Sequence, residues 1–138
     1  MSEQSELLAQ KACEVMQNAY APYSKFHVGA CVQAEDDSMY VGCNVENASY
    51  GLVNCAERSA ILALISAGKK RIKALAIVGP GPDLITPCGA CRQVIREFAA
   101  PDAPIYLCDS RGKIIETTNI NKLLPWSFGP EHLDKDNI

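Results

Sequence analysis

The order of secondary structure is clearest in residues 55–91, which read CAERSAILALISAGKKRIKALAIVGPGPDLITPCGAC. A helix is predicted over 55–67, because Gly68 stands where helices usually stop. The unbroken apolar run Ile72–Val78 is typical of a buried central strand. A second helix is predicted over 88–98, after the glycines and prolines that follow the strand. The stretch therefore predicts a helix, a strand and a second helix, with cysteines at the start of both helices.

Helices and strands also alternate on both sides of this stretch. The hairpin Val28–Ala34 and Met39–Cys43 is expected to be antiparallel, because a short polar turn joins its strands. Two later strands, Ile105–Cys108 and Ile114–Thr117, leave no room for a helix between them, so they are also expected to be antiparallel. From Leu123 onward we expect loop or one short turn. A first helix is predicted from an apolar face made by Leu7, Leu8, Ala12, Val15, Met16 and Ala19. This alternation predicts an α/β fold.

Length, charge and cysteine usage restrict the class of protein. The chain has 138 residues, about the length of one domain, so we expect residues 1–138 to form a single domain. Its net charge is -3, which argues against binding to nucleic acid or to an anionic membrane. No signal peptide is expected, and no apolar stretch approaches the roughly 20 residues of a membrane span. Seven cysteines without a regular framework are typical of a reducing compartment, so the cytosol is the expected location.

Cys55, Cys88 and Cys91 predict a metal site. Each cysteine motif lies at the N-terminus of a predicted helix, where free backbone N–H groups and the helix dipole favour thiolates. Two such helices that begin side by side on one face of a sheet would bring all three sulfurs to one ion. A structural zinc site normally has four protein ligands, whereas a catalytic site has three and leaves the fourth position to water. Three cysteines beside Glu57 therefore predict a zinc ion that activates water, with Glu57 as the general base.

Other interpretations leave part of the pattern unexplained. A redox pair would account for the C-x-x-C motif alone. A zinc ribbon needs a fourth ligand, and neither a second C-x-x-C motif nor the spacing of His27 or His132 supplies one. Glu57, taken alone, would be an acidic residue that suits the positive end of a helix dipole.

Arg58 is a candidate for tuning the metal. Three thiolates more than neutralise a Zn²⁺ ion, which weakens its effect on bound water. Hydrogen bonds from Arg58 to the thiolates would offset that excess negative charge. The ordinary interpretation of Arg58 is an exposed helix cation paired with a nearby acid.

The chain resembles the short, homotetrameric cytidine deaminases, from about Leu7 to Phe128. The resemblance rests on Phe26, Asn44-Val45-Glu46-Asn47-Ala48-Ser49-Tyr50, Cys55-Ala56-Glu57-Arg58 and Pro87-Cys88-Gly89-Ala90-Cys91. It implies zinc-dependent hydrolytic deamination of cytidine and 2′-deoxycytidine to uridine and 2′-deoxyuridine, in pyrimidine salvage, with one Zn²⁺ per subunit. The fold it implies is a three-layer α/β/α sandwich around a mixed five-stranded sheet.

The resemblance also implies a role for each site residue. Cys55, Cys88 and Cys91 would bind zinc. Glu57 would carry a proton from water to N3 of cytosine and later assist the departure of ammonia. The substrate would be bound by Asn44 and Glu46 at the ribose 3′-OH, by Val45, Asn47, Ala48, Ser49 and Tyr50 as pocket walls, by Phe26 and the backbone of Ala56 at the base, and by Phe128 from a neighbouring subunit.

These residues also have ordinary structural interpretations. Asn44 and Asn47 would be turn residues with locally bonded side chains, and Glu46 a solvated surface group. The two phenylalanines would be core or rim aromatics, and Trp126 is expected to pack against other side chains. Small buried apolar positions are expected for the remaining cysteines: Cys13, Cys31, Cys43 and Cys108.

Several functions are compatible with the residues. A nucleoside deaminase leads, and a related deaminase of the blasticidin type, a non-catalytic zinc-stabilised binding module and an RNA-editing enzyme are the alternatives. Polynucleotide-editing deaminases, by resemblance, place a helix between their last two strands and make that pair parallel. The antiparallel pair expected here and the negative net charge both favour a free nucleoside, with neither nucleic acid nor membrane as a partner.

Overall fold

A computed structural model of the chain describes residues 2–133. The helices are α1 (Glu3–Met16), α2 (Ala56–Ser66), α3 (Gly89–Phe98) and α4 (Ile120–Leu123), with two short 3-10 turns, η1 (Tyr50–Leu52) and η2 (Pro130–His132). The strands are β1 (Gly29–Ala34), β2 (Met39–Cys43), β3 (Ile72–Val78), β4 (Ile105–Cys108) and β5 (Ile114–Thr118).

The five strands form one mixed sheet in the order β2-β1-β3-β4-β5. β1 is antiparallel to both of its neighbours, β2 and β3, whereas β3 and β4 run parallel. β4 and β5 are antiparallel, as the short connection between them predicts. The mixed five-stranded sheet and its antiparallel last pair are therefore confirmed.

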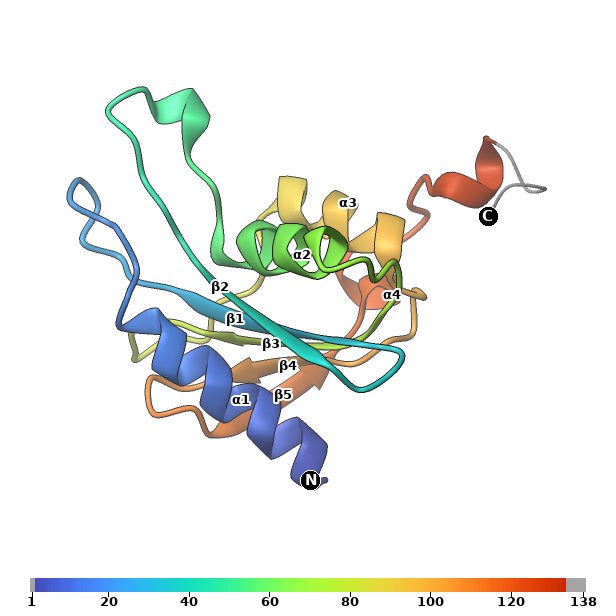
Figure 1. Cartoon of the computed structure of the whole chain (residues 1–138), viewed down its shortest axis with the longest axis horizontal. Coiled ribbons are helices and arrows are strands. Elements are labelled where there is room, and N and C mark those ends of the chain that lie inside the picture. Colours follow the sequence, from blue (N-terminus) through green and yellow to red (C-terminus); the bar gives the residue numbers. More distant parts are fainter. Residues whose placement is uncertain (1, 134–138) are drawn as a thin grey trace.

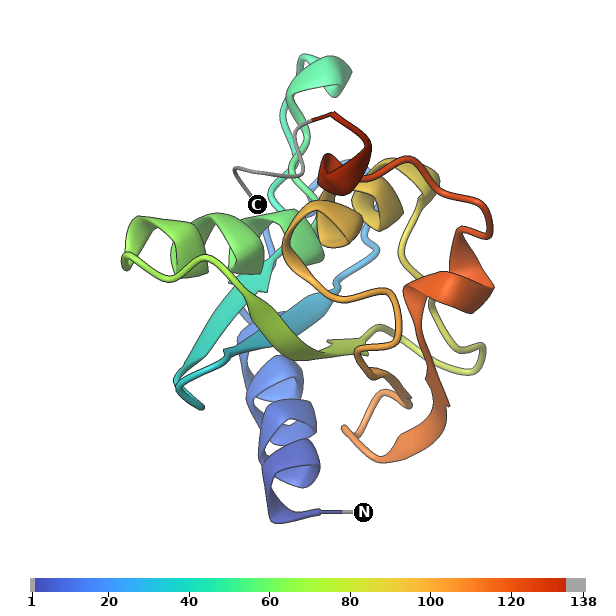
Figure 2. The same cartoon turned by 90° about the vertical axis from the view of Figure 1, so that its right-hand side faces the viewer.

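Helices cover both faces of the sheet, as Figures 1 and 2 show from two directions. α1 lies against one face, where Leu8 and Ala12 pack with Cys31 and other strand residues. α2 and α3 lie side by side on the opposite face, where Ile61 and Ile95 belong to the larger of two apolar cores. The predicted three-layer sandwich, with two helices together on one face, is confirmed.

α2 approaches the sheet closely at Gly42 in β2. A Cβ atom at Gly42 would overlap backbone atoms of Ala56 and Ala60, which lie in the first turns of α2. Because protein interiors are close-packed, only a residue without a side chain permits this approach. The contact sets the distance between the sheet and the N-terminus of α2, where Cys55 is the N-cap residue.

Most element boundaries agree with the sequence predictions to within one residue, but the first helix is shorter than predicted. Its apolar face was expected to reach Ala19, whereas α1 ends at Met16. The chain leaves the helix there because Tyr20 pairs with the segment after β2. The Tyr20 N–H donates to the carbonyl of Asn44 (2.9 Å), and the Glu46 N–H donates to the carbonyl of Tyr20 (2.8 Å).

Two short helical segments were not predicted. α4 is stabilised by its N-cap residue Asn119, whose side chain accepts a hydrogen bond from the Lys122 N–H (3.1 Å). η1 lies within the polar loop between β2 and α2. Both are too short for a periodic apolar pattern to reveal them. In the part of the chain that the structure describes, no helix is long and apolar enough to cross a membrane.

The close approach at Gly42 predicts a position-specific cost for a single methyl group. Gly42→Ala is expected to lower the free energy of unfolding by about 1–3 kcal/mol, because overpacking forces α2 away from β2. Gly51→Ala is the matched control, since a Cβ there meets no atom within 4 Å. Urea unfolding of both variants measures the difference, and equal stabilities would contradict the packing argument.

Candidate active site

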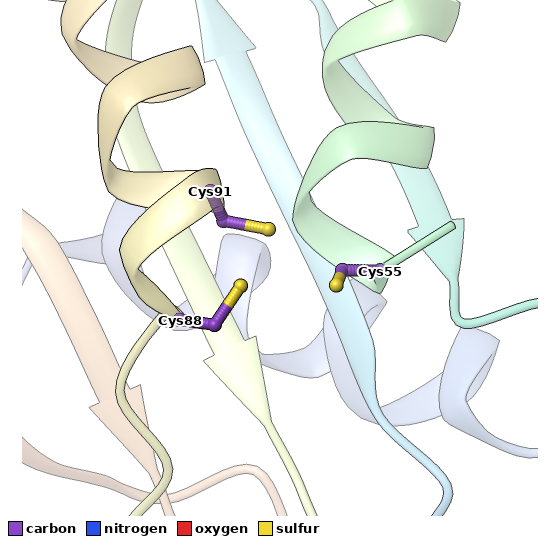
Figure 3. Close-up of side chains that lie close together, drawn as sticks. All are labelled: Cys55, Cys88 and Cys91. Carbon is purple, nitrogen blue, oxygen red and sulfur yellow. The ribbon is translucent and has the colours of Figure 1, made fainter. Parts of the chain in front are cut away.

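The three cysteines lie at the starts of α2 and α3. Cys55 is the N-cap residue of α2 and Cys88 is the N-cap residue of α3, both with extended backbone conformation. Neither sulfur caps its own helix, so both remain free to bind a ligand. Cys91 follows in the first turn of α3, and Figure 3 shows the three side chains directed toward a common point between the helices.

The spacing of the sulfurs fits a single metal ion. The Sγ atoms of Cys55, Cys88 and Cys91 all lie within 4.8 Å of one another. Zinc–sulfur bonds of about 2.3 Å in a tetrahedral site place sulfurs roughly 3.8 Å apart, so a small contraction would seat the ion. Among the described residues, this is the one group of metal-ligating side chains so placed, and His27 and His132 lie outside it.

Arg58 and the helix starts favour negative charge on these sulfurs. The Nη2 atom of Arg58 donates a hydrogen bond to Cys55 Sγ (3.3 Å). A hydrogen bond from the Cys91 thiol, with Arg58 adding to it, lowers the pKa of Cys55 to about 5. The same hydrogen bond raises the pKa of Cys91, because its proton is held by the Cys55 sulfur. The Arg58 contact that the sequence suggested is therefore present.

Glu57 is a buried carboxyl group beside the sulfurs. It is the second residue of α2, and only 4% of its surface is exposed. Burial raises the pKa of Glu57 to about 7, and the negative charge of Cys55 acts in the same direction. A carboxyl group with a pKa near neutrality can both accept and return a proton at physiological pH.

Arg92 holds the turn that carries Cys88, a role that sequence reasoning missed. Its Nε donates to the carbonyl of Pro87 (2.7 Å), and its Nη2 donates to Thr86 Oγ1 (3.1 Å). Its Nη1 donates to the carbonyl of Leu123 (2.7 Å), which ties α4 to the same turn. A cation in the first turn of a helix is unfavourable, because the positive end of the helix dipole lies there. An arginine at this position is therefore the feature of the sequence that could have indicated a specific role for Arg92.

Asn44 links two segments that lie far apart in the sequence. Its side chain is buried, with Oδ1 accepting from the Val28 N–H (2.9 Å) and Nδ2 donating to the carbonyl of Phe26 (2.7 Å). The bonds reach across more than a dozen residues, so Asn44 is not the local turn residue of the alternative interpretation. Phe26 itself is about half exposed.

Glu46 holds the other end of the same loop. Its carboxylate accepts hydrogen bonds from the N–H groups of Tyr23 (3.0 Å) and Ser24 (3.1 Å), and from the Ser24 hydroxyl. The Ser24 hydroxyl contact is the main reason that the pKa of Glu46 is lowered. Glu46 is therefore a constrained anion and not a freely solvated surface group.

A cavity of about 350 Å³ opens beside these residues. Three of the predicted substrate-binding residues line it, and three further residues were not predicted from the sequence. The lining consists of Glu46, Asn47, Tyr50, Tyr23, Ser24 and Val53. Val53 precedes Cys55 by two residues, so the loop that forms the cavity leads directly into α2.

The remaining loop residues are placed in different ways. Val45 pairs with Asn54 through two backbone hydrogen bonds of 2.9 and 3.0 Å, which closes the base of the loop. Asn47 Oδ1 accepts from the Ser49 N–H (2.8 Å), the local turn bond of its ordinary interpretation, while Asn47 also lines the cavity. Ala48 is exposed at the tip of the loop. The backbone of Ala56 begins α2 beside the sulfurs, and its side chain is fully buried.

The C-terminal aromatics lie on the surface of the chain. The expectation that Trp126 packs is wrong for this chain alone, since its side chain is fully exposed. Trp126 lies in the segment after α4 and has a left-handed backbone conformation, with a φ of 59°. Phe128 is about half exposed and stacks on His132, with ring centroids 5.2 Å apart.

The other cysteines take no part in the cluster. Cys31 and Cys108 are buried, as expected of small apolar residues. Cys13 and Cys43 are only half-buried, so the prediction of burial holds for two of these four cysteines.

Three thiols at paired helix starts, next to a buried carboxyl group, are the arrangement of a metal-dependent enzyme that activates water. The family model for the cytidine and deoxycytidylate deaminase zinc-binding region matches residues 2–107. The chain belongs to this deaminase family, and it is an enzyme of the hydrolase class.

Individual relatives support the same family over almost the whole chain. The cytidine deaminase of Sporosarcina psychrophila is 48% identical, with 93% of each chain covered. That of Halalkalibacterium halodurans is 42% identical over 94% of this chain and 97% of its own. A crystal structure of cytidine deaminase from Burkholderia pseudomallei matches with a TM-score of 0.84 at 42% identity, covering 93% of this chain and all of that one.

The cysteine cluster predicts which thiols retain a metal. Cys91→Ser is expected to reduce the zinc content of purified protein from about one ion per chain toward zero, because two thiolates and one poor hydroxyl ligand remain. Cys108→Ser changes another buried cysteine outside the cluster and is expected to keep the metal. Elemental analysis measures both, and equal metal contents would exclude the cluster as the site.

Proposed function

We propose that this protein catalyses the zinc-dependent hydrolytic deamination of cytidine and 2′-deoxycytidine to uridine and 2′-deoxyuridine, with release of ammonia. The observation that carries the proposal is the gathering of Cys55, Cys88 and Cys91 beside the buried carboxyl group of Glu57. The relatives named cytidine deaminase support the same reaction. The cellular role we propose is pyrimidine salvage in the cytosol, carried out by residues 1–138 as one catalytic domain.

Zinc is the proposed metal, one ion per subunit, held by the three cysteines. When bound, it supplies a Lewis acid that lowers the pKa of a water molecule to about 7. Arg58 offsets part of the negative charge of the thiolates through its hydrogen bond to Cys55. The N-termini of α2 and α3 add positive dipole ends at the same place.

Glu57 carries the proton in the proposed reaction. Its carboxylate accepts a proton from the attacking water and delivers it to N3 of the cytosine ring. It then assists the protonation of the amino group that leaves C4 as ammonia. Burial supports this role, because it holds the pKa of Glu57 at about 7 and excludes competing bulk water from the carboxyl group.

Asn44 and Glu46 are proposed to bind the ribose 3′-OH while they also hold the Phe26 loop. The Asn44 amide uses one of its two N–H donors and one of its lone pairs within the chain. The Glu46 carboxylate accepts three hydrogen bonds, and a carboxylate offers about four acceptor sites. Each side chain therefore retains capacity for a sugar hydroxyl without releasing the loop.

The lining of the cavity favours a nucleoside over a nucleotide. Of the described residues that line it, none is basic, and Glu46 contributes a carboxylate. The lowered pKa of Glu46 keeps that group anionic at neutral pH. A phosphate group near it would meet like charge, and no arginine or lysine of the lining would compensate it.

The remaining contacts are proposed to involve a second subunit. Phe26 and the Ala56 backbone would contact the base, while Val45, Asn47, Ala48, Ser49 and Tyr50 shape the pocket. Phe128 would close the pocket of a neighbouring subunit in a homotetramer. The exposure of Trp126 and Phe128 supports self-association, because large aromatic side chains are commonly buried between subunits.

Neither nucleic acid nor a membrane is proposed as a partner. The net charge of -3 provides no electrostatic attraction for a phosphate backbone. β4 and β5 pair antiparallel, whereas the family resemblance implies a parallel pair in polynucleotide-editing deaminases.

The proposed reaction is tested by ultraviolet absorbance with cytidine, 2′-deoxycytidine and cytidine monophosphate on one zinc-loaded preparation. We expect both nucleosides to be converted to their uracil products, and the monophosphate to react more slowly because of Glu46. Absence of any change with cytidine would refute the proposal.

Glu57→Gln separates catalysis from a purely structural zinc site. The amide cannot carry a proton, so kcat is expected to fall by at least about 10²- to 10⁴-fold while zinc content is retained. Glu97→Gln alters an exposed glutamate on α3 and is the matched control. Activity of Glu57→Gln at the level of this control would show that Glu57 is not the proton carrier.

A further inference from the structure

Arg96 is a buried cation on α3 that the proposed reaction does not use. Only 7% of the residue is exposed, and it lies on the same helix as Cys91. Its guanidinium reaches the C-terminal segment: Nε donates to Ser127 Oγ (2.9 Å), and Nη1 donates to Glu131 Oε2 (3.2 Å). Nη2 donates to the second oxygen of the same carboxylate, Glu131 Oε1.

This contact has the geometry of a specific recognition site for the segment 127–132. A paired guanidinium–carboxylate contact restricts both distance and orientation, and a buried arginine is costly without such a partner. The Arg96 guanidinium also holds the pKa of Glu131 at about 2. Because this folded-state pKa is lowered, the ion pair is complete at neutral pH and is lost only as the pH falls through about 2.

Other contacts in the same segment depend on Arg96 lying in this position. A Cβ atom at Gly129 would overlap the guanidinium, so the segment 127–132 crosses Arg96 at the one glycine that the segment contains. Gln93, one helical turn earlier on α3, donates to the carbonyl of Phe128 (2.9 Å). The Gly129 N–H donates to His132 Nδ1 (2.9 Å), and the His132 ring stacks on Phe128. Figure 2 shows the segment and its short turn η2 lying beside α3.

We propose that Arg96 is a positioning residue that, through Ser127 and Glu131, fixes Phe128 on α3 for nucleoside binding. The inference rests on the proposed function, in which Phe128 closes the pocket of a neighbouring subunit. α3 then carries two metal ligands at its start and, at Arg96, the support for an aromatic wall that serves another subunit.

The consequence is a selective effect on substrate binding. Phe128 contacts the nucleoside and not the group that transfers protons, so its misplacement weakens ground state and transition state equally. Arg96→Met is expected to raise KM for cytidine about tenfold, the scale of one lost aromatic contact, with kcat changed less than about twofold. Arg96→Lys keeps the charge but cannot form the paired contact, so it is expected to restore KM only in part.

Two further variants test whether the effect passes through this contact. Gly129→Ala is expected to raise KM as Arg96→Met does, because φ and ψ at Gly129 (-138° and 174°) suit alanine and the three atoms nearest to the added methyl group all belong to the Arg96 guanidinium. In the Arg96→Met background the same alanine is expected to have little effect. Arg111→Met, an exposed arginine between β4 and β5, is the matched control and leaves KM unchanged.

A double-mutant cycle identifies Phe128 as the residue on which Arg96 acts. If Arg96 works by placing Phe128, then adding Arg96→Met to Phe128→Ala raises KM no further. Additive effects of the two substitutions would overturn the proposal. A parallel loss of kcat and subunit assembly in Arg96→Met would also overturn it, because Arg96 would then support the fold or the interface in general.

Trp126 provides a readout that does not need activity. It is the only tryptophan in the chain and lies two residues before Phe128. Arg96→Met and Glu131→Gln are each expected to lower its time-resolved fluorescence anisotropy relative to Arg111→Met, since the segment gains nanosecond motion. Unchanged anisotropy would overturn the positioning role. The variants could show this anisotropy difference while the wild-type protein fails to deaminate cytidine. That result would refute the proposed function and the binding role of Phe128, but the contact between Arg96 and the segment would stand.

Discussion

The site depends on one constraint: two helices must begin side by side on the same face of the sheet. α2 can lie close to β2 because Gly42 has no side chain, and α3 packs next to α2. Their starts then place three sulfurs within 4.8 Å of one another and two positive dipole ends beside them. If the two helix starts were not adjacent, the three sulfurs could not bind one ion, and Glu57 would not lie beside them.

Three arginines connect this arrangement to the rest of the chain, although its net charge is negative. Arg58 donates to the Cys55 sulfur, Arg92 holds the turn before Cys88, and Arg96 binds the C-terminal segment. Arg92 and Arg96 each use several donors of the planar guanidinium group, which lysine cannot reproduce. Charge at the sulfurs, the geometry of the ligand turn and the placement of a distant aromatic residue are thus controlled from two adjacent helices.

The loop residues join substrate recognition to loop order. Asn44 and Glu46 hold the segment that carries Phe26, from opposite ends, and each retains hydrogen-bonding capacity for a ligand. A nucleoside that contacts them would bind to groups whose orientation is already set. Such preorganisation lowers the entropy lost on binding.

The sequence alone predicted the helix and strand order and the antiparallel last strand pair, because these follow from short-range spacing and apolar runs. It also predicted the cysteine cluster with Glu57, because both cysteine motifs lie at the starts of predicted helices. It did not reveal where α1 ends, since Tyr20 pairs with a segment that lies far along the chain. The tertiary structure alone placed Arg96 against Glu131, exposed Trp126 and gave Asn44 its partners. The contacts of Asn44 and Arg96 join residues separated by 16 to 35 positions. The cysteines are equally distant but belong to recognisable motifs at two helix starts, whereas no motif in the sequence indicates the partners of Asn44 or Arg96.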